Sequence, residues 1–226
     1  MGINKFKRTV NFAVHPDDQV AGKVADKFLE TVSKAKDQAM KKPTLYQQHK
    51  AKWKDCTRCL LFRKRRRVVL ARGKLPCDIL LVGEAPGASE NVLGKPFCGP
   101  AGKLLDYIML QAWGEDYTSY AITNLVGCMP LDSDRLHKKS KSYEPPLEAV
   151  KACWPRLEEF IAIAKPDAIV AVGLLAKKYL AGGQPKYAAS IVHPAAILRA
   201  DVSQRGLAIQ QSIVTLRDVR KDLVPF

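Results

Sequence analysis

The sequence lacks several features, and each absence excludes a class of protein. Its 226 residues contain no apolar run that approaches the roughly 18 residues of a membrane-spanning helix, so we expect no membrane segment. The first residues, MGINKFKRTVNF, have no apolar core of a signal peptide, and Phe6 breaks the myristoylation pattern that Gly2 would begin. We therefore expect an intracellular protein.

Acidic residues are scarce relative to basic ones. The chain has 22 Asp and Glu against 37 Lys and Arg, which gives a formal net charge of +15. Such an excess favours a polyanionic partner, most simply nucleic acid, although a basic protein without such a partner is the alternative. Hydrophobic residues make up 47% of the chain, which suits a globular protein with a full core.

The chain has six cysteines, which in an intracellular protein predict metal binding or reactive thiols rather than a disulfide framework. Four of them, a CxxC pair and two from distant segments, form the candidate metal site: Cys56, Cys59, Cys128 and Cys153. Four thiolates suit an iron–sulfur cluster or a tetrahedral zinc site. We expect Cys77 and Cys98 to be small buried residues.

From residue 78 the pattern alternates between short apolar strands and helices. Strands are expected at residues 78–82, 120–125, 168–172 and 189–192. Helices are expected at residues 101–113, 146–164, 174–180 and 202–221. This alternation predicts an α/β fold of three layers, α/β/α, with a central four-stranded parallel sheet covered on both faces.

The N-terminal region follows a different pattern. A helix is expected over about residues 19–40, capped by Asp17 or Asp18, and a short second helix over residues 44–54. We therefore divide the chain into an N-terminal helical extension, residues 1–52, and a main domain, residues 53–226. The extension is expected either to pack on the main domain or to dock a protein partner.

Residues 80–102, LLVGEAPGASENVLGKPFCGPAG, are the stretch around which the chain is organised. An apolar strand enters the loop GEAPG, residues 83–87, whose glycines and proline allow unusual backbone angles and close approach to a ligand. GKPF, residues 94–97, follows before the next helix. Long ordered loops are often functional, although an irregular connection with incidental glycines is the alternative.

Polar residues follow three of the expected strands: Glu84 after the first, Asn124 at the end of the second, and His193 after the last. Ligands of parallel α/β sheets bind beyond the carboxyl ends of the strands, so these positions predict one ligand site. Five consecutive cations, residues 63–67, follow the CxxC. Such a run is commonly a solvated face or a localisation signal, and beside a ligand loop it also suits phosphate contact.

In combination these motifs resemble the uracil-DNA glycosylase superfamily, and within it most resemble the family 4 enzymes, which carry a [4Fe–4S] cluster. The resemblance rests on GEAPG, GKPF, GPAGKLL, TNLVGC, the final His-Pro with Leu198-Arg199, and the four cysteines. It runs from about Cys56 to the end of the chain. It implies an enzyme that flips uracil out of DNA, hydrolyses its N-glycosidic bond and leaves an abasic site, as in base excision repair.

The resemblance also implies roles in binding the base. Phe97 would stack on the flipped base and Asn124 would read the pyrimidine edge, because a carboxamide offers both a donor and an acceptor. The main chain at Gly83 and Glu84 would hold the base carbonyls, with Ala85 beside them. An ordinary core aromatic and a strand-end turn residue are the alternatives for Phe97 and Asn124.

For the chemistry, the resemblance implies that His193 donates a hydrogen bond to uracil O2 as negative charge develops. Glu84 is the first candidate carboxylate to stabilise the oxocarbenium sugar or to orient water, and Glu90 is the second. The alternatives are a structural histidine and, for Glu90, a surface loop acid.

DNA contact is implied for two segments. The candidates in the basic run are Arg63, Arg65, Arg66 and Arg67. The stretch from His193 would approach the duplex through Ala195, with Leu198 or Arg199 filling the gap left by the flipped base; Leu198 could equally be core.

The chain also departs from the family pattern. Ala85 replaces the Asp of family 1 enzymes, and Ala195 replaces the usual Ser, which removes a hydroxyl expected to touch a DNA phosphate. Residues 131–144 form a longer, basic segment.

The resemblance implies a [4Fe–4S] cluster of architectural role, with zinc as the less favoured occupant. Ala195 and the N-terminal extension favour a second hypothesis, a catalytically weak or inactive nucleic-acid-binding relative that acts as a subunit of a replication or repair assembly. A third is a metal-stapled structural subunit without DNA contact.

Overall fold

The computed structural model of the chain describes residues 43–130 and 144–223, together with Lys23, Lys27, Glu30 and Thr31. Contacts divide the chain into two units, Met1–Pro43 and Thr44–Phe226. Those four residues of the first unit are helical, within the helix expected over residues 19–40. The rest of that helix and the basic segment 131–143 lie outside the described residues. A domain boundary near residue 52 stays a prediction.

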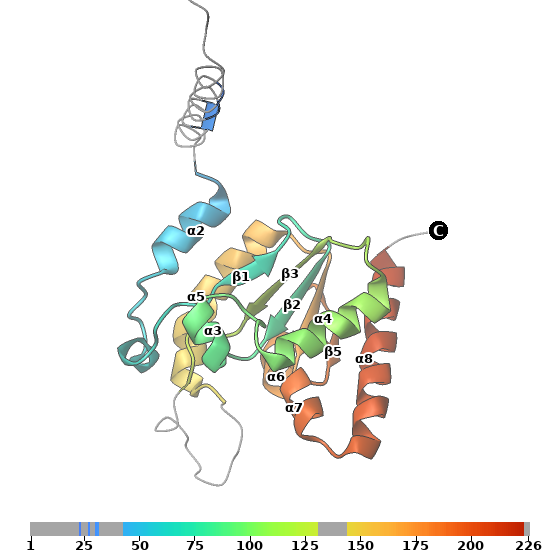
Figure 1. Cartoon of the computed structure of the whole chain (residues 1–226). Coiled ribbons are helices and arrows are strands. Elements are labelled where there is room, and N and C mark those ends of the chain that lie inside the picture. Colours follow the sequence, from blue (N-terminus) through green and yellow to red (C-terminus); the bar gives the residue numbers. More distant parts are fainter. Residues whose placement is uncertain (1–22, 24–26, 28–29, 32–42, 131–143, 224–226) are drawn as a thin grey trace, which may run out of the picture. The chain divides into compact units, whose positions relative to one another are not determined.

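The second unit is built on a five-stranded mixed sheet in the order β1-β3-β2-β4-β5 (Figure 1). Its strands are β1 (Ala71–Gly73), β2 (Ile79–Gly83), β3 (Tyr120–Asn124), β4 (Ala168–Val172) and β5 (Tyr187–Ile191). Strands β2 to β5 are parallel, which confirms the α/β class. The expected count of four strands was one too few. The antiparallel edge strand β1 has three residues, Ala-Arg-Gly, and no apolar pattern that could reveal it.

The helices of the second unit are α2 (Leu45–Trp53), α3 (Ala88–Leu93), α4 (Pro100–Trp113), α5 (Leu147–Ala164), α6 (Leu174–Leu180), α7 (Pro194–Arg199) and α8 (Val202–Leu223), with a 3₁₀ turn, η1, at Leu60–Arg63. Helix α3 lies in the segment expected to be loop, and no element was expected at α7, since six residues are too few for a periodic signal. In the part of the chain that the structure describes, no helix is long and apolar enough to cross a membrane.

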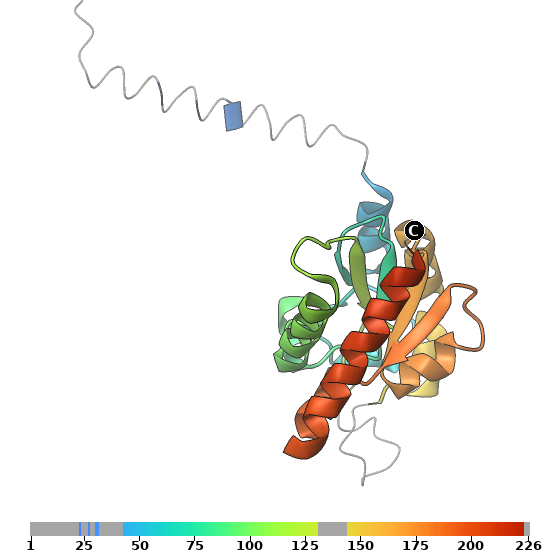
Figure 2. The ribbon, with the colours of Figure 1, turned by 90° about the vertical axis from the view of Figure 1, so that its right-hand side faces the viewer.

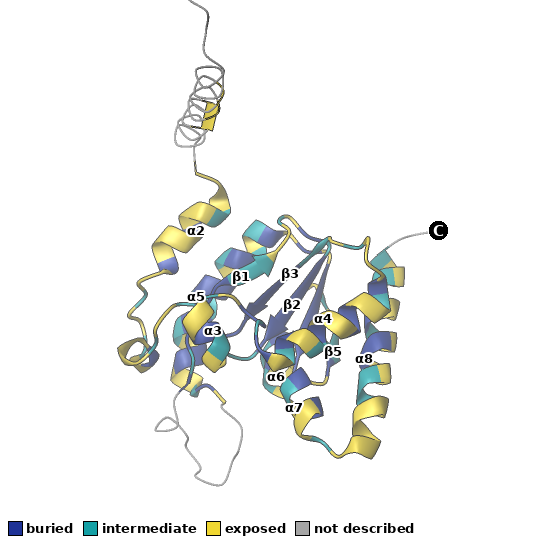
Figure 3. Cartoon of the chain, in the orientation of Figure 1, coloured by how far each residue is buried: buried dark blue, intermediate teal, exposed yellow. Residues whose placement is uncertain are grey.

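Helices cover both faces of the sheet, which confirms the three layers (Figures 1 and 2). Alternate residues of β2 belong to different cores: Ile79 and Leu81 pack with α4 and α8, whereas Leu80 and Val82 pack with α5 and α6. All five residues of the strand are buried, and Figure 3 shows the central strands dark blue along their length. A strand buried on both faces therefore reads as an unbroken apolar run.

The parallel register brings the carboxyl ends of β2 to β5 to one edge of the sheet. Gly83 at the end of β2 pairs with Asn124 at the end of β3. Beyond β4, the backbone N–H of Gly173 donates to the carbonyl of Ile191 at the end of β5, at 3.0 Å. The segments that follow all four strands therefore start side by side.

Candidate active site

A cavity of about 640 Å³ opens at this carboxyl edge. Segments that follow β2, β3, β4 and β5 all contribute to its wall. The residues predicted from the sequence that line it are Glu84, Ala85, Glu90, Phe97, Asn124, His193, Ala195 and Arg199. The structure thus brings side chains from three strand ends to one place.

Gly83 makes the close approach of two of these side chains feasible. A Cβ atom at this position would lie 2.6 Å from Cζ of Phe97 and would also overlap Oδ1 of Asn124. Any side chain here would displace the ring or the carboxamide. The glycine at the end of β2 is therefore needed for the cavity wall, although it does not itself line the cavity.

Phe97 has a backbone conformation that is rare for a residue with a side chain. Its φ is 51°, which costs on the order of 1–3 kcal/mol and persists only where the surroundings enforce it. Arg72 of β1 does so: its Nε donates to Pro96 O at 3.0 Å, and its guanidinium is held by an ion pair with Asp106. The ring is buried, with its centroid 5.8 Å from that of His193.

Asn124 ends β3 with a side chain that is 2% exposed. Its Oδ1 is buried and has no hydrogen-bond partner in the part of the chain that the structure describes. Buried polar atoms are nearly always paired. An unpaired amide oxygen in the wall of a cavity is therefore suited to a ligand N–H donor.

His193 has a defined tautomer. Its Nδ1 accepts a hydrogen bond from the backbone N–H of Ala195 at 3.1 Å, at the start of α7, so the ring proton is on Nε2. Burial lowers the pKa of His193 to about 4, with Arg199 acting in the same direction and Glu90 against it. At neutral pH the imidazole is uncharged and keeps one N–H donor, on Nε2.

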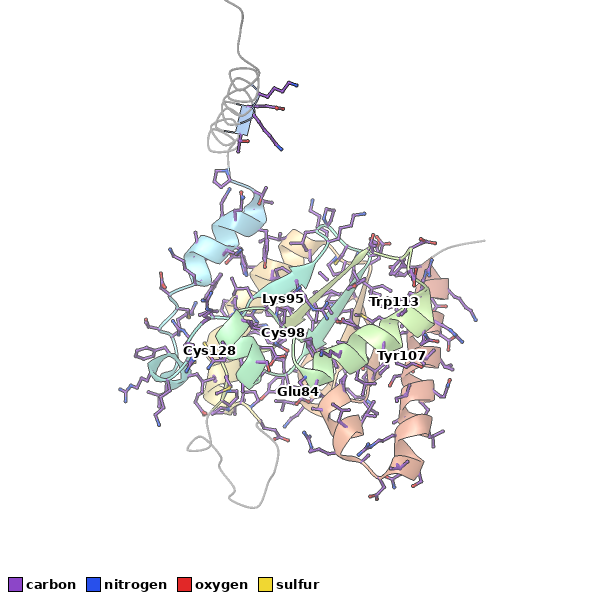
Figure 4. The ribbon with its side chains drawn as sticks, in the orientation of Figure 1. Glu84, Lys95, Cys98, Tyr107, Trp113 and Cys128 are labelled. Carbon is purple, nitrogen blue, oxygen red and sulfur yellow. The ribbon has the colours of Figure 1, made fainter. Side chains whose placement is uncertain are left out.

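Glu84 lies at the carboxyl edge of the sheet, as labelled in Figure 4. Its Oε1 accepts a hydrogen bond from the backbone N–H of Leu175 at 3.0 Å, in the first turn of α6. Burial raises the pKa of the Glu84 carboxyl, whereas that N–H and Arg199 act against the rise. One carboxylate oxygen is thus fixed by the chain, and the group remains part of the cavity wall.

Glu90, in contrast, is fully engaged by the backbone. Its Oε2 accepts from the N–H of Gly87 at 3.1 Å, and its Oε1 accepts from the N–H groups of Cys98 and Gly99 at 3.0 Å each. The side chain is buried, so it is not a surface loop acid. It joins the GEAPG loop to the segment that carries Phe97.

The predicted DNA-contacting residues have different surroundings. Arg63, Arg66 and Arg67 are exposed, and the N–H of Arg66 donates to Asn91 Oδ1 at 2.8 Å, which fixes the run against α3. Arg65 instead turns inward toward the cysteines. Leu198 is 40% exposed and is not core. The assignment of these residues to DNA contact stays a prediction.

Three of the four candidate metal ligands pack in one small cluster: Cys59, Cys128 and Cys153. Cys56 lies beside it, since Arg65 donates both to Cys56 O and to Cys128 Sγ, the latter at 3.8 Å. The N–H of Gly127 donates to Cys153 Sγ at 3.3 Å. Among the described residues no three ligand side chains are arranged to hold a single metal ion.

The remaining two cysteines differ from each other. Cys77 is buried in the α5 and α6 core, as expected. Cys98 is only partly buried, so the expectation of a buried residue was wrong. It follows the strained Phe97, and its backbone N–H donates a hydrogen bond to Glu90 Oε1. The geometry of the loop rather than core packing therefore sets its position.

Two arginines that support the site were missed from the sequence. Arg72 fixes the backbone of Phe97, and Arg156 of α5 donates to the backbone at the end of β3. Arg72 carries no sequence signal, because its partners are brought together only by the fold. Arg156 does carry one: it lies on the buried stripe of α5 with Leu157 and Phe160, where an apolar residue is expected.

Comparison with known proteins gives one family. The model described as the uracil DNA glycosylase superfamily matches residues 70–215. Three curated relatives are named type-4 uracil-DNA glycosylase. That of Pyrobaculum aerophilum is 39% identical over 127 residues, 56% of this chain and 60% of the relative. That of Saccharolobus solfataricus is 33% identical over 127 residues, 56% of this chain and 55% of the relative.

The third, from Thermotoga maritima, is 35% identical over 131 residues, 58% of this chain and 63% of the relative. The matched part of the chain thus spans little more than half the length of these relatives.

Proposed function

We propose that this chain, which belongs to the uracil DNA glycosylase superfamily, hydrolyses the N-glycosidic bond of uracil in DNA and leaves an abasic site. The target nucleotide would leave the stacked duplex and enter the cavity at the carboxyl edge of the sheet. The observation that carries the proposal is the buried, unpaired Oδ1 of Asn124 in the wall of that cavity. Action on DNA would also place the protein inside the cell.

The cavity wall supplies a partner for each part of uracil. In the proposed complex, Asn124 Oδ1 accepts from uracil N3–H and its Nδ2 donates to O4. Phe97 stacks on the ring, and the main chain at Glu84 and Ala85 borders the base carbonyls. The expected main-chain contact of Gly83 is not proposed, because Gly83 does not line the cavity and instead leaves room for Phe97 and Asn124. Glu90 acts on the base through the two loops that it joins. A preorganised wall of this kind binds the base without first having to rearrange.

Cleavage moves the electron pair of the N1–C1′ bond onto the base, so the leaving group is a uracil anion with charge on O2. The Nε2–H of a neutral His193 donates to O2 as this charge develops. The sugar becomes an oxocarbenium ion, which the carboxylate of Glu84 stabilises. Water then adds at C1′ and loses its proton to a base, for which Glu84 is the candidate.

The role of Glu84 predicts a pH dependence of the excision rate. Only the ionised carboxylate stabilises a cation, and burial raises the Glu84 pKa above its ordinary value. The rate should therefore fall as the pH drops through this raised pKa. Glu84→Gln should lower the plateau rate by about tenfold, which is about 1.4 kcal/mol, and remove the acidic limb, because an amide does not titrate. A single-turnover pH profile that keeps its acidic limb in Glu84→Gln would assign that limb to another group.

The four cysteines are proposed to hold a [4Fe–4S] cluster. The donor set fits, because the four sulfurs come from three separate segments of the chain. Arg65 donates to Cys128 Sγ, and the Gly127 N–H donates to Cys153 Sγ. When bound, the cluster crosslinks the segment of η1 to α5, and zinc is the less favoured occupant.

Loss of one ligand should remove the cluster. Cys153→Ala is expected to abolish the brown colour and visible absorbance of the protein and to lower its unfolding midpoint by roughly 10 °C, because a structural crosslink is lost. Cys98→Ala is the matched control and should keep both. Iron and zinc analysis completes the test. A colourless wild-type protein with stoichiometric zinc would show that the four cysteines hold zinc and not a cluster.

A second candidate function is nucleic-acid binding without efficient catalysis, favoured by Ala195 and the N-terminal extension. The deciding experiment incubates the protein with labelled uracil-containing and thymine-containing oligonucleotides and looks for alkali-labile breaks. Breaks at uracil alone support the glycosylase. No breaks at stoichiometric protein, with DNA binding retained, support the binder. If the protein neither produces breaks nor binds the DNA, the result supports the third hypothesis, a metal-stapled structural subunit. Docking of a protein partner through residues 1–52 stays a prediction.

A further inference from the structure

We infer that Arg156 is a positioning residue for Asn124: its buried guanidinium holds the end of β3 so that the carboxamide lies in the cavity wall. The inference deepens the proposed function and relies on it only for what Asn124 reads. Arg156 belongs to α5, on the face of the sheet opposite α4 and α8. It lines no part of the cavity and touches no substrate.

The guanidinium contacts three successive residues at the end of β3. Its Nη1 donates to Thr123 Oγ1 at 3.3 Å, and its Nη2 donates to Leu125 O at 3.1 Å and to Asn124 O. Two of these acceptors are consecutive backbone carbonyls, those of the Asn124–Leu125 and Leu125–Val126 peptide groups. One side chain therefore fixes the backbone that directly follows the Asn124 Cα, from which the carboxamide extends.

The sheet supplies this restraint on one side only. On the β2 side Asn124 pairs with Gly83, and the Leu125 N–H donates to Gly83 O at 2.9 Å. On the other side the ladder between β1 and β3 ends at the pair Ala71–Thr123, so β1 does not reach Asn124 and Leu125. No hydrogen bond to the Asn124 Oδ1 fixes the side chain, because this atom has no partner among the described residues. The direction of the carboxamide thus depends on the backbone at the end of β3, whose N–H groups are held from β2 and whose carbonyls are held by Arg156.

Packing alone does not explain a charge at this position. Arg156 is 1% exposed, and within the described ranges no carboxylate forms an ion pair with it and its Nε has no partner. Burying an unpaired charge is unfavourable, and well-packed apolar replacements of buried charges are often neutral or stabilising. An apolar side chain would suit the core, so the guanidinium serves the end of β3.

The first test needs no enzymatic activity. Hydrogen exchange followed by mass spectrometry is compared between the wild type and Arg156→Met in the full chain. We expect several-fold faster exchange in residues 120–128, where the Leu125 and Val126 N–H groups donate to Gly83 O and Glu84 O at 2.9 and 3.2 Å. Residues 168–172 of β4 should not change.

The matched control is Phe160→Leu, one turn further along α5, which removes buried volume without losing a bond to β3. It should not speed exchange at the end of β3 selectively. Unchanged exchange there in Arg156→Met, or acceleration spread evenly over all strands, would overturn the inference. Loss of the visible absorbance in Arg156→Met would also overturn it, because Arg156 would then act on the cysteines.

The second test is a double-mutant cycle on uracil excision. Arg156→Met should lower kcat/KM about tenfold in the wild type and have no further effect in Asn124→Ala, because it acts through that side chain. Equal effects in both backgrounds would show independent action and overturn the inference. If the wild type cuts no uracil DNA but Arg156→Met loosens the end of β3, the proposed function fails and the positioning role stands.

Discussion

Replacing His193 with alanine is expected to lower the rate of uracil excision by about 10²- to 10³-fold, the usual effect of removing one donor to a developing anion. The ring is neutral, since its Nδ1 accepts from Ala195 and burial lowers its pKa to about 4. The neutral ring keeps the Nε2–H as its one donor, and this donor stabilises the uracil anion. Single-turnover kinetics measure the chemical step, and DNA affinity should change little.

His49→Ala is the matched control for this prediction. His49 is also a buried histidine, but it lies on α2 and packs against Tyr46 and Phe160, away from the cavity residues. This variant should unfold at lower temperature and still excise uracil at nearly the wild-type rate. If His193→Ala and His49→Ala lose activity equally, His193 acts on the fold and not on the leaving group.

Replacing Asn124 with alanine should lower kcat/KM for uracil by about 100-fold, from the loss of two hydrogen bonds of about 1–1.5 kcal/mol each. Without the carboxamide, N3–H and O4 of the base would be buried without hydrogen-bond partners. Excision assays on uracil-containing oligonucleotides over a range of DNA concentrations give this ratio directly.

Ser212→Ala controls for the general effect of losing a buried polar side chain. The Ser212 hydroxyl donates to Ala208 O within α8, at 2.8 Å, and does not line the cavity. Its loss should leave excision unchanged. Wild-type excision by Asn124→Ala would show that the carboxamide does not read the base, and the unpaired Oδ1 would then need another explanation.

Phe97 shows where inference from sequence reaches its limit. The motif GKPF indicates a fixed aromatic beside a ligand loop, and the ring does line the cavity. Nothing in the motif indicates its positive φ, because that conformation is enforced by Arg72, 25 positions earlier, and by Gly102, where a Cβ would overlap the Phe97 carbonyl. The Arg72 contact depends on the pairing of β1 with β3, which no local pattern indicates.

For the two carboxylates, too, the sequence indicates the candidates and the structure distinguishes them. Glu84 and Glu90 both stand out in the loop after β2, but their sequence neighbours do not distinguish them. In the structure Glu90 accepts three backbone hydrogen bonds within its own loop region, whereas Glu84 accepts one, from Leu175. The backbone hydrogen bond to Glu84 depends on where α6 begins, and the packing of the sheet sets that position.

The sequence by itself determined the α/β class, the strands β2 to β5, and the edge of the sheet at which the polar residues meet. These follow from local apolar patterns and from the rule that parallel strands share their carboxyl ends. Only the tertiary structure decided the edge strand β1, the tautomer of His193, the unpaired oxygen of Asn124 and the hydrogen bonds of Arg156 to the end of β3. Each of these depends on which donors and acceptors meet across the fold, and such pairings have no periodicity along the chain.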